Sequence, residues 1–292
     1  MLREGIIVLG NSKMGKVLHI NLPRGIPRGF GLKAFLYGTC PGASVWCLQN
    51  CYGIDKPPSE DISSIDAMNR AIRIALYKPR EFVKKVIDEI EFYSREFLEK
   101  EFYRGEVLLR LHVVGDFYHP DYVNLWLELS DLLREKGVRI WSYTRSWWID
   151  RVEKSYREIE LSNPRKLAEE LFDRLNELRR RSNVALYAST DHTMPDISRI
   201  AEMKEWLEAG IETTYRGNAL TCPEIPCVAC KYCVYGRGDI AFIERNKIRV
   251  VGKPWNKAFS EDEWRDFMRR EGDKVRIFLE RIRSLRSYQI RS

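Results

Sequence analysis

The stretch "EVLLRLHVVGDF", residues 106–117, decides the fold that this sequence predicts. Its first nine residues are rich in leucine and valine, which is typical of a buried strand, and a glycine and an aspartate follow. An apolar strand followed by polar residues returns at "VRIWSYT" (138–144) and "VALYAST" (184–190), and a further strand is expected at "IETTYRG" (211–217). We expect these segments to be strands of one sheet.

Segments with apolar residues at helical spacing separate these strands. Proline or a capping residue marks several of their starts, and glycine marks two of their ends. The expected helices are 64–77, 79–100, one from Pro120 to Gly137, one from Pro164 carrying Leu167, Leu171, Leu175 and Leu178, 196–209, and a long helical region after Ser260. Strands that alternate with helices predict a parallel sheet, either open or closed into a barrel.

Polar residues follow the predicted strands, where parallel α/β folds collect reactive groups. We assign as catalytic candidates His112, Asp116 and Arg145, and as cofactor-binding candidates Gly115, Asp116, Tyr143, Thr144 and Ser189. Structural roles stay open for three of these residues: a hydrogen-bonded core histidine at 112, a loop or helix cap at 116, and an ion pair at 145.

The seven cysteines fall into a set of three and a set of four. Cys40, Cys47 and Cys51 lie in "YGTCPGASVWCLQNCYG" (37–53), where glycines let the backbone wrap closely around an inorganic core. Three thiolates leave one iron of a 4Fe–4S cluster without a protein ligand, and an open coordination site is typical of a reactive centre. A structural zinc site and a loop without metal are the alternatives.

The second set, in "TCPEIPCVACKYC" (221–233), consists of Cys222, Cys227, Cys230 and Cys233. Four thiolates form a complete ligand set, so this site is expected to be closed. Its tight C-x2-C-x2-C core resembles ferredoxin sequences more than zinc ribbons. Because four-thiolate sites suit both metals, a second iron–sulfur cluster and a zinc ion both stay open.

The charge is spread unevenly along the 292 residues, whose formal net charge is +7. Residues 1–33 hold six basic residues against one acidic, and residues 269–292 hold eight against three. Basic ends predict an anionic partner such as RNA or DNA, with a well-solvated thermophile surface as the alternative. The chain has two glutamines beside abundant glutamate, lysine and arginine, a composition typical of thermophiles.

We expect a cytoplasmic protein without a membrane partner. The first thirty residues carry charges and no apolar signal segment, and the longest run without charge, 34–54, is too polar to span a membrane. The expected organisation is one structural unit made of a basic N-terminal extension (1–32), an α/β core (33–220), a four-cysteine segment (221–259) and a C-terminal basic helix (260–292).

The motifs "TCPGASVWCLQNCYG", "RLHVVGDF", "YVNLW", "YTRS" and the four-cysteine run resemble, in this order, the phage gene product 88 family, which is distantly similar to radical S-adenosylmethionine (SAM) enzymes. The resemblance covers about residues 33–235 and implies a partial or complete parallel (β/α) barrel. It implies that Cys40, Cys47 and Cys51 hold a 4Fe–4S cluster whose open iron binds SAM, and that Gly115 and Asp116 hold the SAM amino group. Reduction of that cluster would then yield a 5′-deoxyadenosyl radical that takes hydrogen from the substrate.

The sequence therefore favours a radical-SAM-like iron–sulfur enzyme with an auxiliary second cluster and an electron donor, and nucleic acid is the first candidate for its substrate. Two other classes stay open: a non-catalytic, metal-stapled nucleic-acid-binding protein, and an iron–sulfur redox or electron-transfer module. The polar residues at successive strand ends favour the enzyme, because neither other class needs a convergent set of such groups.

Overall fold

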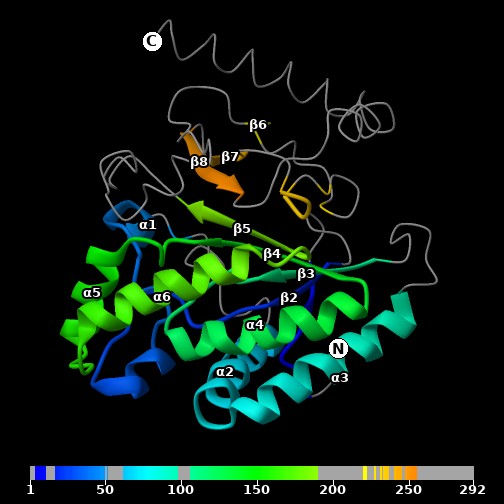
Figure 1. Cartoon of the computed structure of the whole chain (residues 1–292), viewed down its shortest axis with the longest axis horizontal. Helices are drawn as coiled ribbons and strands as arrows, with labels where there is room; N and C mark the ends of the chain where they lie inside the picture. Colours follow the sequence, from blue (N-terminus) through cyan, green and yellow to red (C-terminus); the bar gives the residue numbers. More distant parts are fainter. Residues whose placement is uncertain are drawn as a thin grey trace, which may run out of the picture.

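The structure, a computed structural model of the chain, describes residues 4–10, 17–49, 51, 62–97, 106–189, 220–221, 227, 231, 233–236, 240–244 and 247–254 (Figure 1). The described part is a mixed sheet with helices against one of its faces, which confirms the α/β class. Several predicted features lie outside the described residues: the helix at 196–209, the strand at 211–217, the C-terminal helix, Cys222 and Cys230.

Eight strands form one sheet in the order β1-β2-β3-β4-β5-β8-β7-β6. They are Val8–Leu9 (β1), Leu18–Ile20 (β2), Val107–Leu111 (β3), Val138–Thr144 (β4), Val184–Ser189 (β5), Leu220–Thr221 (β6), Ile240–Glu244 (β7) and Lys247–Pro254 (β8). Strands β2 to β5 are parallel, and so are β6 and β7, whereas β1 is antiparallel to β2 and β8 is antiparallel to both its neighbours. The described pairings leave β1 and β6 at opposite ends of the order, so closure into a barrel stays a prediction.

Three of the predicted strands are confirmed as β3, β4 and β5, and β4 has the predicted bounds. Strand β3 ends at Leu111 rather than Val114, because His112 takes a left-handed backbone conformation with φ 57°. Side chains alternate along β3: Leu109 belongs to the core under the helices, whereas Arg110 lies on the opposite face.

Five longer helices are described: α2 (Ile62–Tyr77), α3 (Pro79–Phe97), α4 (Pro120–Glu135), α5 (Ile149–Glu158) and α6 (Pro164–Arg179). Proline begins α3, α4 and α6 as predicted, at the position where its missing N–H would have no helical partner. Helix α5 was not predicted, because its sequence "IDRVEKSYRE" is mostly polar, although Ile149, Val152 and Tyr156 are buried. None of the helices in the described part is long and apolar enough to cross a membrane.

Aromatic side chains fill much of the space between the helices and the sheet. Tyr118 and Tyr122 stack with their ring centroids 4.7 Å apart, and Phe82 meets Trp126 edge to face with the centroids 5.9 Å apart. All four rings are at most 2% exposed. Burial of rings of this size is the main stabilising contribution in such a core.

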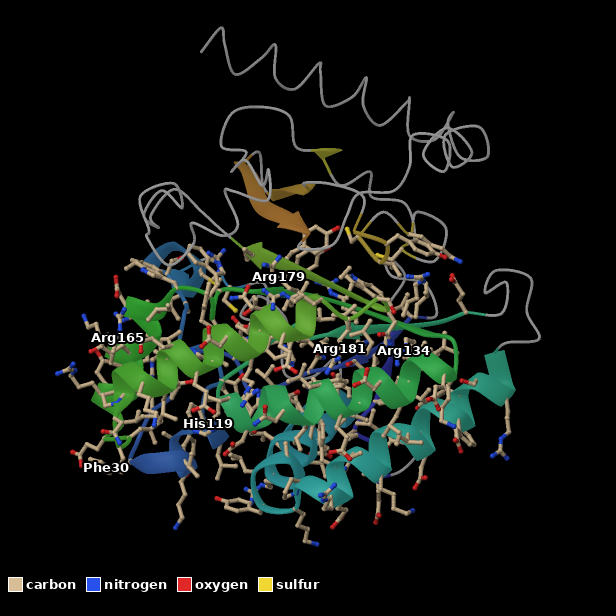
Figure 2. The ribbon with its side chains drawn as sticks, in the orientation of Figure 1. Phe30, His119, Arg134, Arg165, Arg179 and Arg181 are labelled. Carbon is tan, nitrogen blue, oxygen red and sulfur yellow. The ribbon has the colours of Figure 1, made fainter. Side chains whose placement is uncertain are left out.

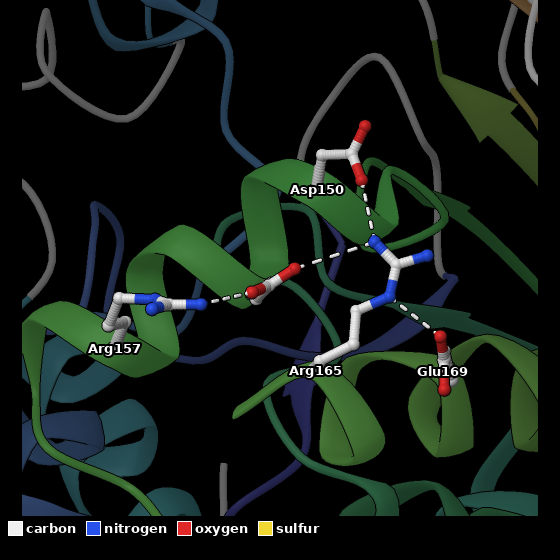
Figure 3. Close-up of polar contacts among 5 residues, drawn as sticks. Asp150, Arg157, Arg165 and Glu169 are labelled. Carbon is white, nitrogen blue, oxygen red and sulfur yellow. Dashed lines mark hydrogen bonds and ion pairs between the residues drawn. The ribbon is translucent and has the colours of Figure 1, made fainter. Parts of the chain in front are cut away.

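Helices α5 and α6 are joined at the surface by ion pairs of Arg165 (Figure 3). Its guanidinium lies 2.8 Å from Asp150, 3.4 Å from Glu153 and 2.6 Å from Glu169. Because Arg165 and two of its partners are well exposed, these pairs contribute little free energy. Apolar packing under both helices therefore fixes the position of α5.

The N-terminal residues form part of the core, whereas residues 1–32 were expected to be an extension before it. Strand β2 pairs with β3 through Leu18, His19 and Ile20. Upstream of it, the backbone N–H groups of Ile6 and Ile7 donate to the buried carboxylate of Glu89, at 3.0 and 2.8 Å. Core packing thus begins well before residue 33.

We predict that Glu89→Gln destabilises the fold by about 1–3 kcal/mol, because the amide turns an N–H group toward the backbone donors of Ile6 and Ile7. Chemical denaturation measures the loss. Glu91→Gln is the matched control: Glu91 lies on the same helix, its side chain is 40% exposed and it pairs with Lys136 at the surface, so its change is expected within about 0.5 kcal/mol. Equal losses for the two variants would contradict this role of Glu89.

Candidate functional site

The first cysteine loop lies against the carboxyl ends of β3 and β4. The 3-10 helix η1 (Gly31–Leu36) leads into it, and the short helix α1 (Val45–Gln49) carries Cys47. In parallel strands the carboxyl ends share one edge of the sheet, so residues after β3 and β4 meet there. The structure brings Gly115, Asp116 and Arg145 together at this edge, as predicted.

Thr39, the residue before Cys40, connects this loop to the end of β3. Its buried hydroxyl accepts the backbone N–H of Asp116 at 3.2 Å and donates to the carbonyl of Pro23 at 2.8 Å. Gly115 makes this approach feasible: its φ is +89°, and a Cβ there would lie 2.6 Å from Leu22 Cβ and 2.8 Å from Thr39 Oγ1. A side chain at position 115 would therefore separate the two segments.

The Asp116 carboxylate connects the ends of β3 and β4. Its Oδ1 accepts the N–H of Phe117 at 2.7 Å, and its Oδ2 accepts the N–H of Arg145 at 2.8 Å. Burial raises the pKa of Asp116 from its ordinary 3.8 to about 6, although hydrogen bonds, among them one from the Thr144 side chain, oppose the rise. These contacts give Asp116 and Thr144 a positioning role in the described structure.

The loop itself is fixed from the β4 side and from α5. A Cβ at Gly42 would lie 2.1 Å from the carbonyl oxygen of Arg145, so the two backbones touch. From α5, Ser155 Oγ donates to the carbonyl of Pro41 at 2.8 Å, and Arg151 Nε donates to that of Ala43 at 3.0 Å. These three contacts fix the segment that follows Cys40.

Cys40 is the thiol of this loop whose ionisation its surroundings disfavour most clearly. Burial raises the pKa of the Cys40 thiol well above its usual range, and the charges of Asp116, Cys47 and Cys51 act in the same direction. Ser44 caps α1, since its Oγ accepts the N–H of Cys47 at 3.0 Å. None of the five described cysteines forms a disulfide, and within the described ranges no three His, Cys, Asp or Glu side chains are gathered to hold a metal ion.

His112 points away from the cysteine loop, into the aromatic core. Its Nε2 lies 3.0 Å from the Tyr122 hydroxyl, and its ring meets Phe117 edge to face at 4.5 Å. Complete burial lowers the pKa of His112 to about 3, so the ring is neutral at physiological pH. The described contacts match the structural alternative for this residue.

The described residues at the end of the second cysteine segment, Lys231 and 233–236, lie on the sheet face that the helices leave uncovered (Figure 1). Glu106, just before β3, holds them: its carboxylate pairs with Lys231 at 3.4 Å, accepts the Tyr235 hydroxyl and pairs with Arg139 at 3.2 Å. Nearby, a hydrogen bond to Cys233 adds to the burial that raises the pKa of Tyr143. Tyr143 therefore belongs to the second cysteine set and not to the first.

Ser189 takes part through its backbone: its carbonyl accepts the indole N–H of Trp147 at 2.9 Å, which ties the end of β5 to the turn after β4. Sequence reasoning missed the residues that fix the loops, namely Thr39, Gly42, Arg151, Ser155 and Glu106. Thr39 and Gly42 flank "Cys40-Pro41", so their place beside a candidate cysteine was a usable signal. The other three lie far from the cysteines along the chain and carry no local pattern.

This geometry defines a mixed α/β protein with a cysteine loop fixed at the carboxyl edge of parallel strands. The family model for gene product 88 matches residues 6–204, and the chain belongs to that family. It is similar to the Gene 88 proteins of Mycobacterium phage D29 (24% identical) and Mycobacterium phage L5 (26% identical), in each case over 82% of this chain and 91% of the relative. No solved structure matches it.

The family match begins and ends earlier than the expected 33–235. It includes β1, β2 and all three cysteines of the first loop, and it ends before Cys222. The first cysteine set thus lies in the part that the family model covers, whereas the second set follows it.

We predict that Thr39→Val lowers the free energy of unfolding by about 2–3 kcal/mol, because the backbone N–H of Asp116 and the carbonyl of Pro23 both lose a buried partner. Thr39→Ser keeps the hydroxyl and loses one methyl group, so a smaller loss of about 1 kcal/mol is expected. Urea denaturation of both variants compares the two losses. A serine variant less stable than the valine variant would contradict the hydroxyl's role.

A second prediction concerns the pH dependence that Asp116 causes. Because its folded pKa is about 6 against 3.8 normally, the folded state holds this proton more tightly than the unfolded chain. Its contribution to stability is present at acidic pH and is lost as pH rises through 6. Relative to Asp116→Asn, the free energy of unfolding of the wild type should fall by up to about 1.4 kcal/mol per pH unit between the unfolded pKa of 3.8 and the folded pKa of about 6. Above the folded pKa, the difference between the two proteins should stay constant.

Denaturation of wild type and Asp116→Asn at a series of pH values measures this difference in the free energy of unfolding. Groups that titrate equally in both proteins contribute nothing to it. A wild-type advantage that grows with pH across the window would overturn the assignment.

Proposed function

We propose that this chain is an iron–sulfur enzyme of the radical SAM type, in which Cys40, Cys47 and Cys51 hold a 4Fe–4S cluster with one open iron. One observation carries the proposal: three thiols share a loop that is fixed at the carboxyl edge of parallel strands. Reactive sites of parallel α/β proteins occupy that edge. Three thiolates match the donor chemistry of such a cluster.

The cluster, when bound, would supply one-electron reduction of SAM, and the chain's own residues would supply its position. Thr39 and Gly42 hold the loop against the ends of β3 and β4. Asp116 holds those ends together through the N–H groups of Phe117 and Arg145. The described thiols are not gathered at metal-binding positions. The proposal is therefore supported by the type and number of donor groups and by the fixed loop that carries them.

The roles of several candidate residues belong to this proposal. Gly115 and Asp116 would lie beside the SAM amino group, and Arg145 and Ser189 would face SAM or substrate from the ends of β4 and β5. Asp116 already accepts two backbone N–H groups, so a ligand amine would share its oxygens with them. A barrel closed by the rest of the chain, an electron donor and a cytoplasmic location belong to the proposal as well.

For Cys222, Cys227, Cys230 and Cys233 we propose a closed auxiliary site with iron–sulfur or zinc. The Glu106 contacts with Lys231 and Tyr235 support it, because they hold this segment against the sheet without help from the first loop. A closed four-thiolate site suits both metals. Its position on a different part of the sheet from Cys40 predicts that each set binds its metal independently.

Metal analysis of anaerobically purified protein tests the proposal. About eight irons and eight sulfides per chain are expected with two clusters, or about four of each plus one zinc if the second site holds zinc. Cys47→Ala should lose about four irons and keep the second site, and Cys227→Ala should do the reverse. These variants control for each other, since each removes one thiol from one set.

The electron paramagnetic resonance spectrum of the reduced protein should change when SAM is added, and Cys47→Ala should abolish that change. Zinc at both sites, or a spectrum indifferent to SAM, would overturn the radical enzyme. Loss of both metals in either single variant would contradict independent sites. A metal-stapled binding protein is then the second candidate, favoured by the exposed basic and aromatic residues before Cys40.

A further inference from the structure

The segment before the first cysteine loop exposes large apolar side chains beside basic ones. Phe30 is 73% exposed, Tyr37 70% and Leu32 49%, which makes Phe30 and Tyr37 the two most exposed large apolar side chains among the described residues. The sequence of 24–37, "RGIPRGFGLKAFLY", contains three basic residues and no acidic one. In fact no aspartate or glutamate occurs between Glu4 and Asp55.

The three basic side chains, Arg24, Arg28 and Lys33, are exposed and have no ion-pair partner within the described ranges. This distinguishes them from Arg157 on α5 and Arg165 on α6, whose charges are paired with carboxylates. Glu158 and Glu160 flank the carbonyl that η1 contacts, but neither pairs with the three cations in the described part. The segment therefore presents uncompensated positive charge beside apolar surface.

The backbone that carries the exposed rings is attached to the rest of the protein. Gly31 N–H donates to the carbonyl of Ile159 at 2.7 Å, and Tyr37 N–H donates to that of Ala34 at 3.1 Å. Beneath them Phe35 is fully buried and packs on Tyr118 with ring centroids 4.8 Å apart. Because this backbone is already fixed, a ligand that stacks on the rings has to order their side chains but not the chain that carries them.

We propose that residues 24–37 form a binding surface for single-stranded nucleic acid, in which Phe30 and Tyr37 stack on bases while Arg24, Arg28 and Lys33 contact phosphates. Aromatic platforms combined with basic side chains are what such binding requires. The rise of a 3-10 helix places Phe30 and Tyr37 roughly 14 Å apart along the axis, so each ring would take a different base.

A lipid surface fits less well. Helices that lie in a membrane interface present a long apolar face, whereas η1 has six residues and buries its own Ala34 and Phe35 in the protein. One end of the segment also touches the first cysteine loop, since the Cys40 N–H donates to the carbonyl of Gly25 at 2.9 Å. The inference deepens the proposed function by naming its substrate class, but it requires no metal at the cysteines.

Fluorescence anisotropy of the full chain with labelled oligo-dT and oligo-U tests the surface. Phe30→Ala and Tyr37→Ala are each expected to weaken binding about tenfold. For three contacted phosphates, log K should fall with log salt with a slope of about −2, and Arg28→Ala should reduce the slope to about −1.4. The controls Phe92→Ala on α3 and Arg134→Ala, at the far end of the helical layer from Phe30 (Figure 2), should bind within twofold of the wild type.

Iron content and thermal unfolding of the same variants should match the wild type, because none of the substituted side chains is buried. Wild type that binds neither oligonucleotide, or Phe30→Ala and Tyr37→Ala that bind as tightly as wild type, would overturn the proposal. Binding to phosphatidylserine vesicles with no binding to oligonucleotides would do the same and would assign the surface to lipid. Each of these results can occur with iron present and the SAM response intact, so this inference and the proposed function can fail separately.

Discussion

The carboxylate of Asp116 is the constraint on which the candidate site depends. It is buried, and it accepts backbone N–H groups from Phe117 after β3 and from Arg145 after β4, so two strands that are adjacent in the sheet stay adjacent beyond their last ladder bonds. The cysteine loop then needs only short contacts to be positioned, through Thr39 to the backbone of Asp116 and through Gly42 to the backbone of Arg145. A buried charge is costly unless it is well hydrogen-bonded, and here those bonds shape the edge of the sheet.

The second cysteine segment depends on a different carboxylate. Glu106 precedes β3, at the amino end of the strand whose other end carries Asp116, and it binds Lys231, Tyr235 and Arg139. One strand thus has a carboxylate beyond each end, and each carboxylate fixes one cysteine-bearing segment. The range that the family model matches, 6–204, contains both Glu106 and Asp116, although it contains only the first cysteine set.

The regular elements were predictable from sequence because their signals are local. Proline at the start of α3, α4 and α6 and the apolar runs of β3 to β5 each specify one element, and the bounds of β4 were correct. The sequence also predicted that Asp116 and Arg145 would meet at one edge. It did not predict that His112 would turn into the core, because this follows from a single left-handed residue, nor that α5 would hold the loop, because Arg151 and Ser155 lie more than a hundred residues from their partners. Such contacts depend on the assembled layers and leave no periodic trace.

The distance along the chain between the first cysteine loop and its supports has a consequence for biosynthesis. The partner of Thr39, Asp116, lies 77 residues later in the chain, and the partner of Pro41, Ser155, lies 114 residues later. While the chain is being made from its N-terminus, residues 37–51 leave the ribosome long before β4 and α5 exist, at a rate of roughly 5–20 residues per second. For several seconds the three thiols therefore lack the contacts with β4 and α5 that later fix their loop. During that interval they are more accessible to oxidants than in the folded protein, so the order of synthesis makes this loop one of the last parts of the described core to be fixed.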